Sequence, residues 1–282
     1  MSDFQISVIG LGLMGGSLAF ALRGFRDCRI TGYDLDASVA AAALERGAID
    51  RAAASPREAA DGASLTLFCS SPHTIIENMR MCIPIFKKGS VVSDICGIKR
   101  DIFAFAERHM PPHADYVGTH PMAGKEVGGF VNADPRIFAG AGFILTPSER
   151  CRPESAELLR EAALYAGAGR VVINRAGEHD RLIAYTSDLM HISAAALCAD
   201  FPPDMTMAHT AGAFRDCTRI ADIDAELWTE LLTENADNIK PFLDAYISAL
   251  TDVKSALARD DRVFLNSFLS RAARNKRRIK TL

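Results

Sequence analysis

Apolar residues in the first part of the chain form short runs that alternate with longer amphipathic segments. The runs predict β-strands at 4–10, 28–34, 64–70, 89–95, 114–120, 141–146 and 170–173. The segments between them predict helices, for example at 13–24, 74–86 and 153–166. Strands that alternate with helices are typical of a parallel sheet covered on both faces. Residues 1–174 are therefore predicted to form an α/β domain with a parallel sheet.

The pattern changes near residue 174, where the strand-like runs end. Apolar residues at helical spacing continue through 176–200, 225–258 and 261–279. We therefore predict a second, all-α domain at 175–282. The chain has no internal repeat and no low-complexity segment.

Composition narrows the class of protein. Hydrophobic residues make up 49% and charged residues 24% of 282, with a net charge of −3. This balance is ordinary for a globular enzyme and favours neither nucleic acid nor membrane as a partner. The seven cysteines are scattered and never spaced C-x-x-C, so we expect no disulfide framework, no metal site and a reducing cytoplasm. The start of the chain lacks the pattern of a signal peptide, and we expect no apolar run that is long enough to span a bilayer.

A glycine-rich stretch follows the first predicted strand. Gly10, Gly12 and Gly15 fit G-x-G-x-x-G between that strand and a helix. In this motif the first glycine permits a tight turn, the second lets the backbone approach a pyrophosphate, and the third allows close packing. The N–H groups at the helix start bind phosphate. We predict a Rossmann-type dinucleotide site that also includes Leu13 and Met14.

An acidic residue at the end of the second predicted strand indicates which dinucleotide binds. Asp34 lies nineteen residues after Gly15, where a carboxylate accepts hydrogen bonds from the adenine ribose. It would repel a 2′-phosphate, so NAD is predicted and NADP is less favoured, although one of three nearby arginines could offset the repulsion. Ser70, at the end of a later strand, is assigned to the same site. The alternative is a glycine turn that binds no nucleotide.

Two strand ends offer groups for a substrate. In "GTHPMAGKEVGGF", His120 precedes a proline and several glycines, so it is expected where a strand gives way to a loop. The alternative is a surface turn with an incidental imidazole. Lys99 follows another strand, and open α/β sheets bind ligands beyond these ends. An exposed lysine at a helix start is the more common case.

The later helical segments carry further candidates. His191 lies four residues after Ser187 and shares a helix face with it, although a single histidine on an apolar helix is usually a core residue. Arg215 and Arg219 are also four apart, and two guanidinium groups suit a dianionic substrate. A surface pair that balances nearby aspartates is the alternative. Trp228 is expected in the core or at an interface.

Taken in order, these motifs resemble those of the prephenate/arogenate dehydrogenase family of tyrosine biosynthesis. The resemblance runs from residue 6 to about 240, through the glycine loop, D-x-x-G-x-K (94–99), HPMAG-x-E-x-x-G (120–129), S-x-L-x-H (187–191) and F-R-D-x-T-R-I-A-x-x-D-x-x-x-W (214–228). It implies an NAD-dependent oxidative decarboxylation of prephenate to 4-hydroxyphenylpyruvate, or of arogenate to tyrosine. It also implies a homodimer that forms through the helical domain.

The resemblance implies a role for individual residues as well. His120 would draw the proton off the substrate hydroxyl, which suits an imidazole with a pKa near working pH. Arg219 would bind a substrate carboxylate, and His191 would line the substrate pocket. Further residues expected near the substrate are Gly97, Lys99, Gly124, Glu126 and Arg215.

The chain departs from the family pattern at two places. Gly97 stands where the family often has a serine that hydrogen-bonds the base and the substrate hydroxyl. That role is empty here, or it passes to Cys96, Lys99 or water. In the family's S-H-L-P-H, the first histidine and the proline are replaced by Asp188 and Met190.

Three rival functions remain. An arogenate-specific enzyme fits the same motifs. A β-hydroxyacid-type dehydrogenase would need a lysine on the first long helix of the second domain, and 176–200 contains none. An NAD sensor without chemistry would need the glycine loop but not the combination of His120, His191 and Arg219.

Overall fold

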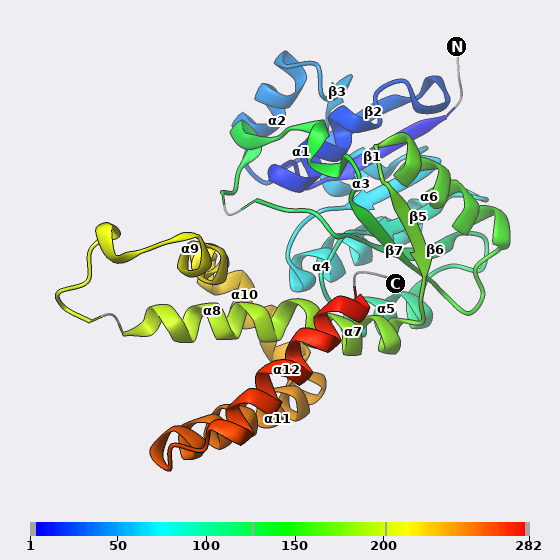
Figure 1. Cartoon of the computed structure of the whole chain (residues 1–282). Coiled ribbons are helices and arrows are strands. Elements are labelled where there is room, and N and C mark those ends of the chain that lie inside the picture. The colour runs from blue at the N-terminus through cyan, green and yellow to red at the C-terminus, as the bar shows by residue number, and fades with distance from the viewer. Residues whose placement is uncertain (1–3, 126, 201, 280–282) are drawn as a thin grey trace. The chain divides into compact units, whose positions relative to one another are not determined.

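The computed structural model describes residues 4–125, 127–200 and 202–279, and it divides into two compact units (Figure 1). The first unit spans Met1–Asn235 and the second spans Ala236–Leu282.

An eight-stranded sheet with the strand order β3-β2-β1-β4-β5-β6-β7-β8 forms the centre of the first unit. The strands are β1 (Gln5–Ile9), β2 (Arg29–Tyr33), β3 (Arg51–Ala52), β4 (Leu65–Phe68), β5 (Val91–Asp94), β6 (Asp115–Pro121), β7 (Gly142–Pro147) and β8 (Arg170–Ile173). Each strand predicted from the sequence is present, and the very short β3 was not predicted.

The sheet is mostly parallel, as predicted, but β7 runs antiparallel to β6. A parallel pair needs a crossover of a dozen or more residues, usually a helix. Between β6 and β7 the described residues form only two short 3₁₀ turns, η3 (Phe130–Asn132) and η4 (Pro135–Phe138). These turns are too short to carry the chain back across the sheet, so β7 returns in the opposite direction. β8 then pairs in parallel with β7.

Helices cover both faces of the sheet, because the side chains of its central strands are apolar in both directions. They are α1 (Leu13–Ala21), α2 (Ala37–Glu45), α3 (Pro56–Ala60), α4 (Pro72–Cys82), α5 (Arg100–His109) and α6 (Pro153–Tyr165). On β1, Ile6 and Val8 belong to one core cluster and Ile9 to a second. Successive side chains of a strand point to opposite faces, so the two clusters are the two layers of a three-layer α/β fold.

After β8 the described residues contain helices and no strand, as the sequence predicts. The elements of the first unit are α7 (Ala176–Ile183), η5 (Ala184–Asp188), α8 (Leu189–Ala199), η6 (Met207–His209), α9 (Gly212–Thr218), η7 (Arg219–Ala221) and α10 (Ala225–Glu234). The single helix predicted at 176–200 is divided by η5, which is a π-helical turn. Figure 1 shows α7 and α8 as one long rod across this turn.

The compact units meet at residue 235 rather than at 174. The helix α7 packs against α5 and β7, so the first helices of the predicted all-α domain belong to the same compact unit as the sheet. A domain boundary at 174/175 stays a prediction.

The second unit is a helical hairpin. The helix α11 (Ala236–Ala258) contacts α12 (Arg262–Ile279). Asp261 accepts a hydrogen bond from the N–H of Phe264 at 2.9 Å, which caps the start of α12. Several apolar side chains of this unit are exposed, among them Leu257 at 65% and Leu269 at 64%.

The rod formed by α7 and α8 is also apolar. Over Ala176–Ala199 an 18-residue window reaches a mean hydropathy of 1.3, so by length and composition alone this helix could cross a membrane. The expectation that no run is long enough therefore needs this correction. A single helix of this kind is weak evidence for a membrane span. Three polar side chains on the rod, His179, Asp180 and Asp188, are buried and hydrogen-bonded inside the unit.

Candidate active site

The glycine loop connects β1 to α1 at the carboxyl end of the central strands. Gly10 has a φ of +92°, and a Cβ there would lie 2.6 Å from the carbonyl oxygen of Cys69. A Cβ at Gly15 would lie 1.9 Å from the carbonyl oxygen of Gly10. Packing inside the protein therefore requires both glycines, as the motif predicts.

Gly12 has a different surrounding. A Cβ at Gly12 would meet no described atom within 4 Å, so internal packing does not require glycine there. Gly12 is also the N-cap of α1 and makes no side-chain capping bond. The first N–H groups of α1, at Leu13 and Met14, are thus available to a phosphate.

Asp34 and Ser70 border this loop. Oδ2 of Asp34 accepts a hydrogen bond from the Leu11 N–H at 2.7 Å, which places the carboxylate against the glycine loop. The Ser70 hydroxyl is buried and has no hydrogen-bond partner among the described residues. Leaving a buried hydroxyl unpaired is costly, so a bound group that pairs with it would be stabilised. These features fit a dinucleotide.

His120 lies near the end of β6, two strands from β4 in the sheet, as the sequence predicts. Its Nδ1 is 2.9 Å from Nε2 of His179 on α7. The other ring nitrogen of His179, Nδ1, is 2.7 Å from Oδ1 of Asp180. The His179 side chain has no exposed surface, and Asp180 is 2% exposed. A histidine, a second histidine and a carboxylate therefore form one hydrogen-bonded row.

Sequence reasoning did not find His179 or Asp180. The pair lies 59 residues after His120 along the chain, and no local spacing connects them. In the sequence, the two residues are visible only as an adjacent His-Asp pair near the start of the apolar helical segment 176–200. Such a pair is weak evidence for a functional role. The fold brings the row together because α7 packs against both α5 and β7.

Asp180 also fixes the start of α5. Its two carboxylate oxygens accept the backbone N–H groups of Lys99 and Arg100, both at 2.9 Å. The backbone carbonyl of Asp180 accepts a hydrogen bond from the buried amide of Asn235 at 3.0 Å, and the same amide donates to Asp188 at 2.7 Å. The row is thus anchored to two other helices.

Lys99 has no exposed surface. Its ammonium group forms an ion pair with Asp94 and donates to the carbonyl oxygens of Cys96 and Thr119, both at 2.7 Å. Thr119 directly precedes His120. The structure therefore places Lys99 inside the protein, where it connects the β5–α5 turn to β6.

The charges around His120 determine its protonation. Burial lowers the pKa of His120 well below its usual range, and the neighbouring His179 and the Lys99 ammonium lower it further. Burial also lowers the pKa of His179, against the opposing effect of Asp180. Both imidazoles are therefore neutral near pH 7, which is the state that a general base needs.

Gly97 lies against the outer edge of the His120 ring. A Cβ at Gly97 would be 3.8 Å from both Cε1 and Nε2 of His120, an ordinary contact distance. Cys96, one candidate for the missing serine's role, is buried, and burial raises the pKa of its thiol to about 12. A second candidate, Lys99, uses its ammonium group inside the protein. Water, the third candidate, stays a prediction.

His191 lies on α8, twelve residues after His179, which corresponds to roughly 18 Å of helical rise. Its ring stacks on Trp228 of α10 with centroids 3.6 Å apart. Its Nδ1 contacts the carbonyl oxygen of Ser187 at 3.0 Å. Arg219 begins η7, which packs against α8, and Arg215 lies one turn earlier on α9, which also contacts α8. Both arginines are exposed.

Two predicted site residues fall in the loop after β6. Gly124 is exposed there, and a Cβ at this position would meet no described atom within 4 Å. Glu126 lies outside the described residues. Between them, Lys125 makes a 4.0 Å ion pair with Asp134.

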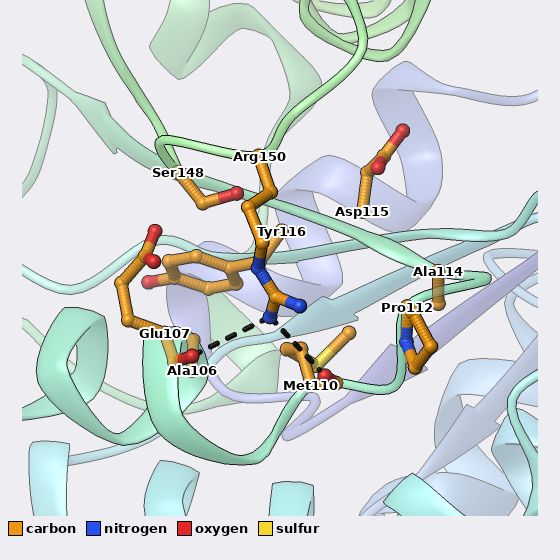
Figure 2. Close-up of a pocket in the computed structure, with 9 residues that line it drawn as sticks. All are labelled: Ala106, Glu107, Met110, Pro112, Ala114, Asp115, Tyr116, Ser148 and Arg150. Carbon is orange, nitrogen blue, oxygen red and sulfur yellow. Dashed lines mark hydrogen bonds between the residues drawn. The ribbon is translucent and has the colours of Figure 1, made fainter.

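A cavity of about 90 Å³ lies at the opposite end of β6 (Figure 2). Asp115 and Tyr116, which begin β6, are among its lining residues. The Arg150 guanidinium lies across it and donates to the carbonyl oxygens of Glu107 and Met110, at the end of α5 (Figure 2). This arrangement caps a helix C-terminus, so the cavity is separate from the site around His120.

Comparisons with known proteins agree with the geometry. Residues 18–173 match the family model described as prephenate dehydrogenase, nucleotide-binding domain. Residues 175–271 match prephenate dehydrogenase, dimerization domain. The cyclohexadienyl dehydrogenase of Zymomonas mobilis is 28% identical over 98% of this chain and 96% of its own length. The prephenate dehydrogenase of Bacillus subtilis is 28% identical over 91% of this chain and 71% of its own length.

Solved structures give the same result. The prephenate dehydrogenase from A. aeolicus, in complex with hydroxyphenyl propionate and NAD+, has a TM-score of 0.86 at 25% identity, over 99% of both chains. The Synechocystis arogenate dehydrogenase has a TM-score of 0.81 at 26% identity, over 99% of this chain and 100% of its own. Since two family models together cover most of its length, the chain belongs to the prephenate dehydrogenase family.

Proposed function

We propose that this protein is an NAD-dependent dehydrogenase that oxidatively decarboxylates prephenate, arogenate or both in tyrosine biosynthesis. The observation that carries the proposal is the position of a neutral, half-buried His120 on β6, beside strands whose glycine loop fits a dinucleotide. Relatives with names from both substrate classes support it.

The chain's own groups divide the work. The first N–H groups of α1 and the Ser70 hydroxyl hold the dinucleotide, and Asp34 favours NAD over NADP. Bound NAD supplies a hydride acceptor. Nε2 of His120 accepts the proton of the substrate hydroxyl while a hydride leaves the ring carbon that bears this hydroxyl. The ring carboxylate departs as CO2.

The other end of the substrate is assigned to the helices after β8. The guanidinium of Arg219 binds a carboxylate, with Arg215 nearby, and His191 is held against the substrate by Trp228. The half-buried turn at Gly97 and the exposed loop at Gly124 are assigned positions beside the ring of the substrate. Lys99 supports the site from inside, since its ammonium group is already paired.

An assay of NADH formation tests this function. The protein is given prephenate or arogenate, each with NAD or NADP, and absorbance reports turnover. We expect turnover with NAD and at least one substrate. His120→Asn should keep NAD binding and reduce kcat by on the order of 10²–10⁴. His109→Asn, a matched change at an exposed histidine on α5, should leave kcat unchanged.

Near-normal turnover by His120→Asn would remove His120 from the role of base. No turnover by the unsubstituted protein with either substrate would contradict the function itself.

We further propose a cytoplasmic homodimer that forms through residues 175–282. Exposed apolar side chains on α11 and α12 support this, because contiguous apolar surface marks an interaction site. The family model that matches 175–271 is a dimerization domain.

A further inference from the structure

Two buried residues of α7 face the proposed base, and no sequence motif pointed to them. His179 and Asp180 lie behind His120, on the side of its ring away from Gly97. Neither residue has surface to offer a substrate. Their arrangement nevertheless determines which nitrogen of His120 carries a proton.

The direction of the hydrogen bonds follows from the carboxylate. Asp180 accepts two backbone N–H groups, one at each carboxylate oxygen, from Lys99 and Arg100, so its carboxyl group is the acceptor at this end of the row. Nδ1 of His179 must therefore donate to Asp180. Because a neutral imidazole has one donor and one acceptor, Nε2 of His179 is then an acceptor.

The proton position of His179 in turn determines that of His120. An acceptor at Nε2 of His179 requires a donor at Nδ1 of His120, 2.9 Å away. The proton of neutral His120 is therefore on Nδ1, and its Nε2 has a free lone pair. This is the nitrogen that faces Gly97 at the carboxyl end of the sheet.

We infer that His179 and Asp180 are positioning residues that hold His120 in the tautomer with a free Nε2 and accept a hydrogen bond from its imidazolium during turnover. The inference rests on the proposed function, in which His120 is the base. Throughout the reaction the proton on Nδ1 of His179 stays in its hydrogen bond to Asp180. The proton of the substrate hydroxyl moves to Nε2 of His120, and the imidazolium returns it to the phenolate oxygen after CO2 has left, so the base is regenerated.

Other charged groups around the pair do not reverse this arrangement. The Lys99 ammonium, from the β5–α5 turn, and Asp94, from β5, are paired with each other. Lys99 disfavours a charge on His120, so the acceptor supplied by His179 is the group that offsets this effect when the imidazolium forms. Removing that acceptor should lower the basicity of His120, and it should also allow the proton of neutral His120 to occupy either ring nitrogen.

Two variants of His179 test the inference. In His179→Leu the acceptor is lost while the volume is kept, so kcat should fall at least about tenfold with little change in KM. The acid limb of the kcat/KM profile should move to lower pH, because the imidazolium has lost its partner. In His179→Gln the amide oxygen replaces Nε2, so kcat and the acid limb should return toward the values of the unsubstituted protein.

The result that would overturn the inference is equally defined. If both variants keep normal kcat, or if both lose the same activity with an unmoved acid limb, His179 only fills space. Thermal melting and NADH binding show whether each variant is folded.

A measurement without substrate separates this inference from the proposed function. In ¹⁵N-histidine spectra of the free protein, assigned with His120→Asn, the proton of His120 should be on Nδ1. A proton on Nε2 would overturn the inference even in an active enzyme. If the unsubstituted protein turns over neither substrate, the function fails, but these spectra still test the row.

Discussion

At the scale of single residues, Gly97 is one of the positions where this chain departs from the pattern of the family that it resembles. The structure shows that the difference is local. A side chain at this position would touch only the edge of the His120 ring, at an ordinary contact distance of 3.8 Å, and Gly97 is not among the glycines with positive φ. The backbone therefore does not require glycine there.

Gly97→Ser should consequently fold normally and restore a hydroxyl beside Nε2 of His120. One hydrogen bond contributes about 0.5–1.5 kcal/mol, so kcat/KM should rise by roughly 2–10-fold. NADH formation measures it, and Gly97→Ala, which adds the Cβ without the hydroxyl, should stay at the original value. Equal rates for the serine and alanine variants would show that the hydroxyl has no partner.

Residue-scale prediction from the sequence succeeded where one strand or one turn holds the information. His120 lies at the end of its predicted strand, and Gly10 and Gly15 occupy the tight turn that the motif requires. Lys99 was expected to face the pocket, but it is buried, because Asp94 and two carbonyl groups bind its ammonium. His179 and Asp180 were missed, since their role depends on packing between distant helices.

At the scale of secondary-structure elements, the last residue of α10 is Glu234, whose carboxyl group is influenced by the charges at the start of α5. One oxygen of Glu234 is buried without a hydrogen-bond partner among the described residues. Burial raises the pKa of Glu234 to about 7, and the carboxylates of Asp101 and Glu230 add to this effect. The folded protein therefore favours the protonated form of Glu234.

This shift makes the stability depend on pH. Below the ordinary pKa of 4.5, Glu234 is protonated in both states and costs nothing. As pH rises from about 4.5 to about 7, the unfolded state releases the proton of Glu234 while the folded state retains it, so stability is lost across this range and the loss is complete above pH 7. Glu234→Gln should raise Tm at pH 8 by roughly 2–4 °C, for about 1 kcal/mol after allowance for solvent screening.

The gain should largely disappear near pH 4, below the ordinary pKa of 4.5, where Glu234 is protonated in the folded and the unfolded state. Circular dichroism melting curves at the two pH values measure it. Glu226→Gln, at an exposed position on the same helix, is the matched control and should show no gain that depends on pH. A constant gain for Glu234→Gln at both pH values would contradict the raised pKa.

The sequence predicted most helices and strands, but it predicted neither the direction of β7 nor the π-helical turn η5. The alternation of apolar and polar residues defines a strand, but it does not define its direction, so the antiparallel β7 followed only from the lack of a crossover helix in the structure. The π turn η5 is likewise invisible in a helical pattern, because one inserted residue changes the phase by only a fraction of a turn.

At the scale of the whole molecule, the helical hairpin of α11 and α12 exposes several large apolar side chains, among them Leu257 and Leu269. We expect light scattering to give twice the 30.5 kDa of one chain. A double change of Leu257 and Leu269 to Glu should reduce that mass, because charge at an apolar interface is costly. Leu164→Glu, at an exposed leucine on α6, should leave the mass unchanged.

A monomer mass for the unsubstituted protein at micromolar concentration would contradict the dimer. A dimer that survives the double change would place its interface elsewhere on residues 175–282, away from Leu257 and Leu269.

The row from His120 to Asp180 also limits how segments of this protein can be exchanged with those of its relatives. One family model ends at residue 173 and the other begins at 175, so His120, the proposed base, belongs to the first segment, and His179 and Asp180 belong to the second. If the proposed roles hold, a chimaera that exchanges the second segment with that of a relative needs an equivalent histidine and carboxylate, or its kcat should fall at least about tenfold, as expected for His179→Leu. The proposed site is thus divided between two segments of sequence that have to be exchanged together.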